Sequence, residues 1–120
     1  MLAHERLRAW AVSHELTVAV YRATEEWPKR EVYGLTSQVR RAAAAVPTNL
    51  AEGAAKRGTR EYRRFVDIAL GSIAEVAYLL HLARDLGLLD PSDHARLDEL
   101  RKRTGGLIWR LARALDQHRP

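Results

Sequence analysis

The spacing of apolar residues, which recur at intervals of three and four, most restricts how this chain can fold. Such spacing places side chains on one face of an α-helix and differs from the alternation of a strand. Four segments show it, at about residues 5–26, 35–56, 60–86 and 91–117. Short connections between helices favour antiparallel neighbours. The sequence therefore predicts one all-α domain over residues 1–120, an antiparallel up-down-up-down four-helix bundle.

The apolar positions of each segment also predict the core. The first helix is expected to bury a stripe made of Leu7, Trp10, Ala11, His14, Val18 and Tyr21. The second stripe consists of Leu35, Val39, Ala42, Val46, Leu50 and Ala54. The third consists of Phe65, Ile68, Ala69, Ser72, Val76, Leu79, Leu80, Ala83 and Leu86. The fourth consists of Leu97, Leu100, Thr104, Leu107, Leu111 and Leu115.

Composition narrows the class of protein. At 120 residues, with 47% hydrophobic and 29% charged residues, the chain is long enough to bury a core. It has no cysteine, which excludes disulfides and is typical of cytoplasmic proteins. Charged residues interrupt the N-terminal segment, so we expect no signal peptide. No window approaches 18 uncharged apolar residues, so we expect no membrane span.

The residue patterns of common enzymes are absent from this sequence. A di-iron bundle needs Glu-x-x-His pairs, and no glutamate has a histidine three residues later. Zinc-protease, nucleophile-elbow and phosphate-loop patterns are also missing. We therefore expect no enzyme activity, no metal, no cofactor and no small-molecule substrate. One alternative is a ribonuclease, because Arg113 and His118, or Arg8 and His14, have the spacing that some helical ribonucleases use.

Positive charge is concentrated in the middle of the chain. The formal net charge is +5 and the pI about 10.1, which favours polyanionic partners. Between Lys29 and Arg64 there are nine basic and three acidic residues, whereas the rest of the chain has eleven and twelve. This segment predicts a nucleic-acid-binding surface formed by Arg40, Arg41, Lys56, Arg57, Arg60, Arg63 and Arg64.

Three of these arginines stand in the expected first turn of the third helix. The helix dipole disfavours cations at that position, so Arg60, Arg63 and Arg64 break a local rule, as residues at functional sites often do. Such a helix terminus can bind phosphate. The alternative is a solvated face that Glu61 and Asp67 partly neutralise, in a chain whose 17 arginines reflect genomic composition or thermal adaptation.

Several longer motifs resemble one protein family. They are W-x3-HEL from Trp10, VYRATEEWP, YGLTSQVRRAAAAVPTNLAEG, EYRRFVDIALGSIAEV and LARDLGLL, in this order up to Leu89. The chain thereby resembles the 23S rRNA intervening-sequence proteins, which include the accessory variability determinant of diversity-generating retroelements. The resemblance implies a four-helix bundle, a ring-shaped homopentamer and nucleic-acid association through basic residues. In retroelements it also implies a reverse transcriptase as partner.

The central motif provides candidate assembly residues. Pro47, Asn49, Glu52 and Gly53 resemble the family's P-x-N-x-A-E-G signature. Asn49 and Glu52 are neighbours on a helix face, so they could bond the carbonyl that Pro47 leaves free, or bond across a subunit boundary. An oligomer interface would likewise explain the polar residues Tyr33, Gln38 and Arg41.

Two functions follow from these observations. The first is a non-catalytic, oligomeric protein that binds RNA or DNA through its basic patch. The second is a protein-interaction or scaffold module, whose arginines pair with acidic residues of a partner or of a neighbouring subunit. Salt dependence separates them, because phosphate binding releases counterions and therefore weakens steeply as salt increases.

Overall fold

The computed structural model describes residues 2–32 and 34–117, apart from the side chains of Leu2 and His4. It contains the α-helices α1 (Leu2–Ala23), α2 (Leu35–Ala54), α3 (Thr59–Asp85) and α4 (Pro91–Gln117), and a short 3-10 helix η1 (Lys29–Glu31). No strand occurs in these residues. The predicted all-α fold is therefore confirmed.

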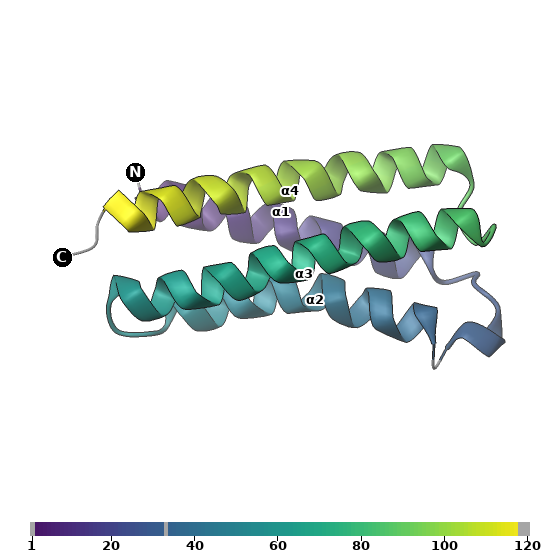
Figure 1. Ribbon diagram of the computed structural model, residues 1–120, viewed down its shortest axis with the longest axis horizontal. Coiled ribbons are helices and arrows are strands. Elements are labelled where there is room, and N and C mark those ends of the chain that lie inside the picture. The colour runs from purple at the N-terminus through teal and green to yellow at the C-terminus, as the bar shows by residue number, and fades with distance from the viewer. Residues whose placement is uncertain (1, 33, 118–120) are drawn as a thin grey trace.

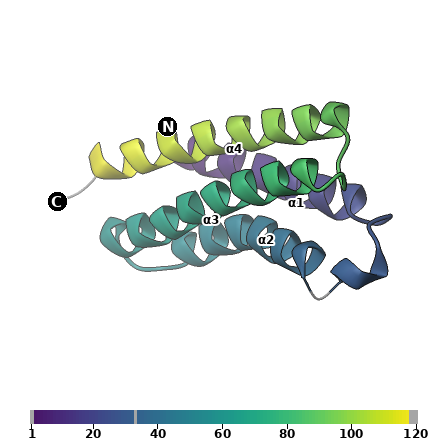
Figure 2. The ribbon, with the colours of Figure 1, turned by 45° about the vertical axis from the view of Figure 1, so that its right-hand side comes forward.

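The four helices run up, down, up and down. In Figure 1 the two ends of the chain lie at the same end of the bundle as the turn between α2 and α3. Each helix packs against two others, in the pairs α1–α2, α2–α3, α3–α4 and α4–α1. Figure 2 shows the same arrangement from a second side. The molecule is an elongated bundle of about 49 × 25 × 18 Å.

The helix ends differ from the expected positions by a few residues. α1 ends at Ala23 rather than near residue 26, because the amide of Trp27 donates to the carbonyl of Thr24 (3.1 Å) in a turn. α2 ends at Ala54 rather than at residue 56. Gly58 then adopts a φ of 83°, which side chains rarely tolerate, and leads the chain into α3.

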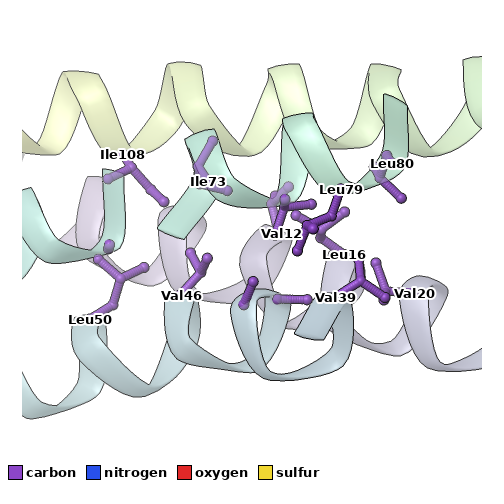
Figure 3. Close-up of a cluster of buried hydrophobic side chains, with 14 of the residues drawn as sticks. Val12, Leu16, Val20, Val39, Val46, Leu50, Ile73, Leu79, Leu80 and Ile108 are labelled. Atoms are coloured by element: carbon purple, nitrogen blue, oxygen red, sulfur yellow. The ribbon is translucent and has the colours of Figure 1, made fainter. Parts of the chain in front are cut away.

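The core is a column of aliphatic side chains from all four helices. Figure 3 shows its centre, which is formed by Val12, Leu16, Val20, Val39, Val46, Leu50, Ile73, Leu79, Leu80 and Ile108. Burying each such side chain contributes roughly 1.5–3 kcal/mol. The predicted stripe of α2 is buried from Leu35 to Leu50, with Ala54 half-buried, and the α4 stripe is buried except for half-buried Leu100. On α3, Ile68 and Leu86 are exposed instead.

The predicted stripe of α1 is wrong. Leu7, Trp10 and Tyr21 are 65%, 42% and 43% exposed, and of the six predicted residues only Val18 is half-buried. The core face of α1 consists instead of Ala9, Val12, Ser13, Leu16 and Val20. Apolar residues therefore occupy both faces of this helix. Periodicity alone does not distinguish the two faces, and the prediction took the one with the larger side chains.

Pro47 is accommodated inside α2 by a residue of α1. A proline at this position cannot donate to the carbonyl four residues earlier, on Ala43. The hydroxyl of Thr17 lies within hydrogen-bond distance of that carbonyl (3.0 Å) and of the Ser13 carbonyl of its own helix (2.9 Å), and its one proton is shared between them. Asn49 donates instead to the carbonyl of Ala45 (2.8 Å). The expectation that Asn49 or Glu52 satisfies the freed carbonyl is therefore wrong, because α1 packs close enough to supply a donor.

Gly53 allows α2 and α3 to approach each other closely. A Cβ atom at this position would lie 2.8 Å from the Cβ of Phe65 and 2.9 Å from Cδ1 of Tyr62. Real Cβ atoms do not approach other carbons this closely, so any side chain here would push the two helices apart. The glycine of the central motif therefore has a packing role within the chain.

α3 is also long and apolar enough, by composition alone, to cross a membrane. Two carboxylates, those of Asp67 and Glu75, interrupt its apolar sequence. Its most apolar side chains, among them Val66, Ile73 and Leu80, are buried against the other helices. Core helices of soluble bundles have the same composition, so this feature is weak support for a membrane span.

Candidate nucleic-acid interface

The antiparallel path of the chain makes one end of the bundle basic. We define the basic end as residues 2–13, 46–72 and 105–117, which form the half with the α2–α3 turn and the chain termini in Figure 1. These residues include nine lysines and arginines and five acidic residues. The remaining described residues include ten of each. The charge excess among the described residues therefore lies at this end.

Three cations at the α2–α3 turn, which we call the turn cations, have no carboxylate partner among the described residues. Lys56, Arg57 and Arg60 are exposed, and none of them forms an ion pair with the residues that the structure describes. The ammonium of Lys56 lies 5.4 Å from the ring centre of Phe65, and the guanidinium of Arg64 lies 4.7 Å from it. Phe65 is 9% exposed, so it supports these cations but cannot stack on a base.

The two other arginines of this helix start have acidic partners. Arg63 bonds Asp67 on α3 and Asp116 on α4, the latter at 3.0 Å. Partial burial lowers the pKa of Arg63, but these hydrogen bonds outweigh it and raise the pKa overall. Arg64 lies 3.4 Å from Glu61 and remains exposed. Arg63 therefore ties α3 to α4, while Arg64 keeps a loosely paired charge at the surface.

Arg40 and Arg41 lie apart from this cluster. The Nε of Arg40 donates to the hydroxyl of Thr24 (2.7 Å), and its Nη2 donates to the carbonyl of Tyr21 (3.3 Å). Its guanidinium also covers the Tyr21 ring at 4.7 Å. Arg40 thus binds the end of α1 instead of pointing freely into solvent. Arg41 is also exposed. It lies 15 residues before Lys56, which is about 22 Å along the direction of α2.

The sequence prediction missed cations from the first and last helices. Arg6 and Arg8 of α1 and Arg110 and Arg113 of α4 are exposed at the basic end. A signal for the α4 residues exists, because five basic residues and no acidic residue lie between Glu99 and Asp116. An acidic start of α4 masks this signal when charges are summed along the chain.

The residues of the central motif lie in different surroundings. Pro47 and Gly53 are buried, whereas Gln38 and Glu52 are exposed on α2 and form no side-chain hydrogen bond or ion pair with the described residues. Asn49 is half-buried. Tyr33 lies outside the described residues. Of the predicted assembly residues that the structure describes, Gln38, Glu52 and the exposed Arg41 are therefore accessible to a partner.

A groove of about 1010 Å³ lies between α1 and α4. Its charged lining has both signs, with Arg22, Arg96 and Arg103 near Glu15, Glu26, Asp93 and Glu99. Among residues 2–32 and 34–117, no three histidine or carboxylate side chains cluster as metal ligands would. Of the ribonuclease candidates, His118 lies outside the described residues, and His14 stacks on Trp10 at 5.3 Å.

These features define the class of protein as a small four-helix bundle with one basic end. The chain belongs to the family described as 23S rRNA-intervening sequence protein, whose profile matches residues 5–110. It is also similar in fold to the crystal structure of a protein of unknown function from the S23 ribosomal protein family of Bacteroides thetaiotaomicron VPI-5482. That similarity has a TM-score of 0.83 at 14% identity, over 91% of this chain and 98% of the other. Comparison with curated proteins gives no significant match.

Proposed function

We propose that this protein is a non-catalytic, self-associating protein that binds RNA or DNA through its basic end. The observation that carries the proposal is the group Lys56, Arg57 and Arg60, whose charges no described carboxylate offsets. They surround the start of α3, where free backbone amides add to their attraction for phosphate. Arg60 stands in the first turn of α3, where a cation costs stability, so a binding role explains why it is there.

The outer face of α1 supports self-association. Leu7, Trp10 and Tyr21 leave a large part of their apolar surface in water. A helix that is apolar on both faces is normally buried on both. A second copy of the chain that covers this face would complete the burial of α1. We refer to Leu7, Trp10, His14, Val18 and Tyr21 as the outer stripe.

The same stripe supports the second candidate, a scaffold that binds another protein. The ion pairs of Arg63 and the hydrogen bonds of Arg40 remove two predicted arginines from any phosphate-binding set. These contacts do not involve the turn cations Lys56, Arg57 and Arg60. We therefore favour nucleic acid, rather than another protein, as the ligand of the basic end. A reverse transcriptase as partner remains a proposal that rests on the family resemblance, and a cytoplasmic location remains one that rests on the lack of cysteine.

The charge proposal is tested with two matched triple variants. The first is Lys56→Gln/Arg57→Gln/Arg60→Gln at the basic end. The control is Arg22→Gln/Lys29→Gln/Arg30→Gln, which removes the same three charges from exposed positions at the other end. Binding to a fluorescent RNA and to a DNA duplex is measured by anisotropy between about 50 and about 200 mM salt.

We expect the basic-end variant to bind at least about tenfold more weakly. Its slope of log affinity against log salt should also fall by about 2–3, because each phosphate contact contributes about 0.7–0.9. The control should stay close to the unmodified protein. Equal losses in both variants would show that only net charge matters. If the unmodified protein binds neither RNA nor DNA at low salt, the nucleic-acid function is wrong and the scaffold function is the remaining candidate.

Self-association is tested separately by the mass of the native protein. The chain has a mass of 13.6 kDa, so light scattering resolves a monomer from any assembly. We expect Leu7→Glu/Trp10→Glu to dissociate the assembly. The control variant Tyr78→Glu changes an equally exposed apolar residue on α3 and should leave the mass unchanged. A monomeric unmodified protein at micromolar concentration contradicts this part of the proposal.

A further inference from the structure

Trp109 is the most exposed tryptophan that the structure describes. It is 54% exposed and lies on the outer side of α4, while its neighbour Ile108 points into the core and is fully buried. The guanidinium of Arg113, one turn later, lies 5.0 Å from the centre of the indole ring. This cation–π contact holds a positive charge beside the exposed indole.

The surroundings of Trp109 are basic and open. Between Glu99 and Asp116, α4 has five basic residues and no acidic one. Arg110 and Arg113 follow Trp109 in the sequence, and both are exposed. The preceding turn contains Gly106, where a Cβ atom would meet nothing within 4 Å. No bulky side chain at that position covers the approach to the ring.

The position of Trp109 connects it to the basic end. On the neighbouring helix, Arg63 bonds Asp116, which lies two turns beyond Trp109 on α4. Arg63 holds the carboxylates of Asp67 and Asp116, and the guanidinium of Arg64 lies 3.4 Å from the carboxylate of Glu61. A strand whose phosphates contact the turn cations can therefore extend along α4 toward the indole, past carboxylates that are already engaged.

We propose that Trp109 is a base-stacking platform and that the preferred ligand of the basic end is single-stranded nucleic acid. This inference rests on the proposed nucleic-acid function and adds the class of ligand. Single-strand-binding proteins combine a basic track with aromatic side chains on which bases stack. Duplex bases are already stacked on one another and cannot reach an indole on a convex helix surface. Two other described rings have cations over them: Phe65 is buried and cannot serve, and Tyr21 lies near the end of α1, away from the basic end.

The test compares a single-stranded oligonucleotide of about 15 nucleotides with a duplex of the same length. Trp109→Ala should weaken single-strand binding by about 5- to 100-fold and change duplex binding less than about twofold. Trp109→Phe keeps a ring and should retain most of the affinity. Tyr78→Ala is the matched control, because Tyr78 is exposed but has no cation over its ring.

Intrinsic fluorescence provides a readout that a structural role would not produce. Stacking of a base on the indole should quench the tryptophan emission of the unmodified protein when the unlabelled single strand is added. In Trp109→Phe this quenching should disappear although the strand still binds. The other tryptophans, Trp10 and Trp27, remain in that variant as an internal reference.

Four outcomes would overturn the inference. They are equal losses for single strand and duplex in Trp109→Ala, no loss for either ligand, quenching that persists in Trp109→Phe, and a change in native mass in Trp109→Ala, which would mark a protein interface. None of these outcomes contradicts a loss of nucleic-acid affinity in the triple variant at Lys56, Arg57 and Arg60. Failure of the stacking site is thus separable from failure of nucleic-acid binding.

Discussion

The close approach of α2 and α3 at Gly53 leads to a prediction that can be worked out from the structure. In Gly53→Ala the new methyl group would lie 2.8 Å from Cβ of Phe65, 2.9 Å from Cδ1 of Tyr62 and 3.3 Å from the Tyr62 carbonyl. A Cβ atom and a carbonyl oxygen cannot rotate away as the end of a long side chain can. These short contacts can therefore be relieved only if α2 and α3 move apart.

Two effects of opposite sign decide the magnitude of this change. Replacing a glycine within a helix by alanine favours the helix by about 1 kcal/mol. Overpacking a tight contact costs about 1–3 kcal/mol or more, and this contact involves atoms close to the backbone. We expect a net loss of about 1–2 kcal/mol in the free energy of unfolding, which lowers Tm by roughly 4–10 °C for a domain of this size.

The chain offers two controls for the same substitution. At Gly71 and Gly106, which lie within α3 and α4, a Cβ atom would meet nothing within 4 Å. Gly71→Ala and Gly106→Ala should therefore stabilise the protein by about 0.5–1 kcal/mol. Urea unfolding followed by circular dichroism, at one protein concentration because association adds stability, measures all three. The reasoning fails if Gly53→Ala is as stable as the two controls.

Two further predictions concern polar groups. Thr17→Val should cost about 1–3 kcal/mol, because the carbonyl of Ala43 loses its donor, and Thr17→Ser should recover most of this loss in the same urea assay. Burial raises the pKa of Asp98, but the hydrogen bond from Arg101 outweighs it and lowers the pKa overall. The stability that ionised Asp98 provides is therefore present above its unfolded-state pKa and is lost as the pH falls through its folded-state pKa. Asp98→Asn should reduce this acid loss, measured as the urea midpoint below about pH 4, and an unchanged acid profile would contradict it.

The sequence predicted the fold because each helix repeats an apolar pattern with a helical period. It failed on α1, where Leu7, Trp10 and Tyr21 form as regular a stripe as Val12, Leu16 and Val20. Periodicity identifies an amphipathic helix from one apolar face, and it has no means to rank two. Packing decides, because the small residues beside the inner stripe let α1 lie close to the neighbouring helices.

The candidate site could be predicted only in part, for a related reason. A sum of charges along the chain finds Lys56, Arg57 and Arg60, which are adjacent in sequence. It cannot find Arg6 or Arg113, which reach the same end of the bundle only after the chain has reversed its direction three times. Nor can it identify which arginines already have hydrogen-bond partners, because the two acceptors of Arg40 lie 16 and 19 residues away, at the end of α1 and in the turn that follows it.

The outer stripe and the basic end have a geometric relation that links assembly to binding. The stripe runs along the length of α1, whereas the free cations lie at one end of the bundle. Copies that associate side by side in the same direction place their basic ends together, so one strand can contact several copies and its affinity rises through effective concentration. Copies that associate in opposite directions separate these ends by about the 49 Å length of the bundle. Dissociation by Leu7→Glu/Trp10→Glu would then weaken binding of a short strand only in the first arrangement.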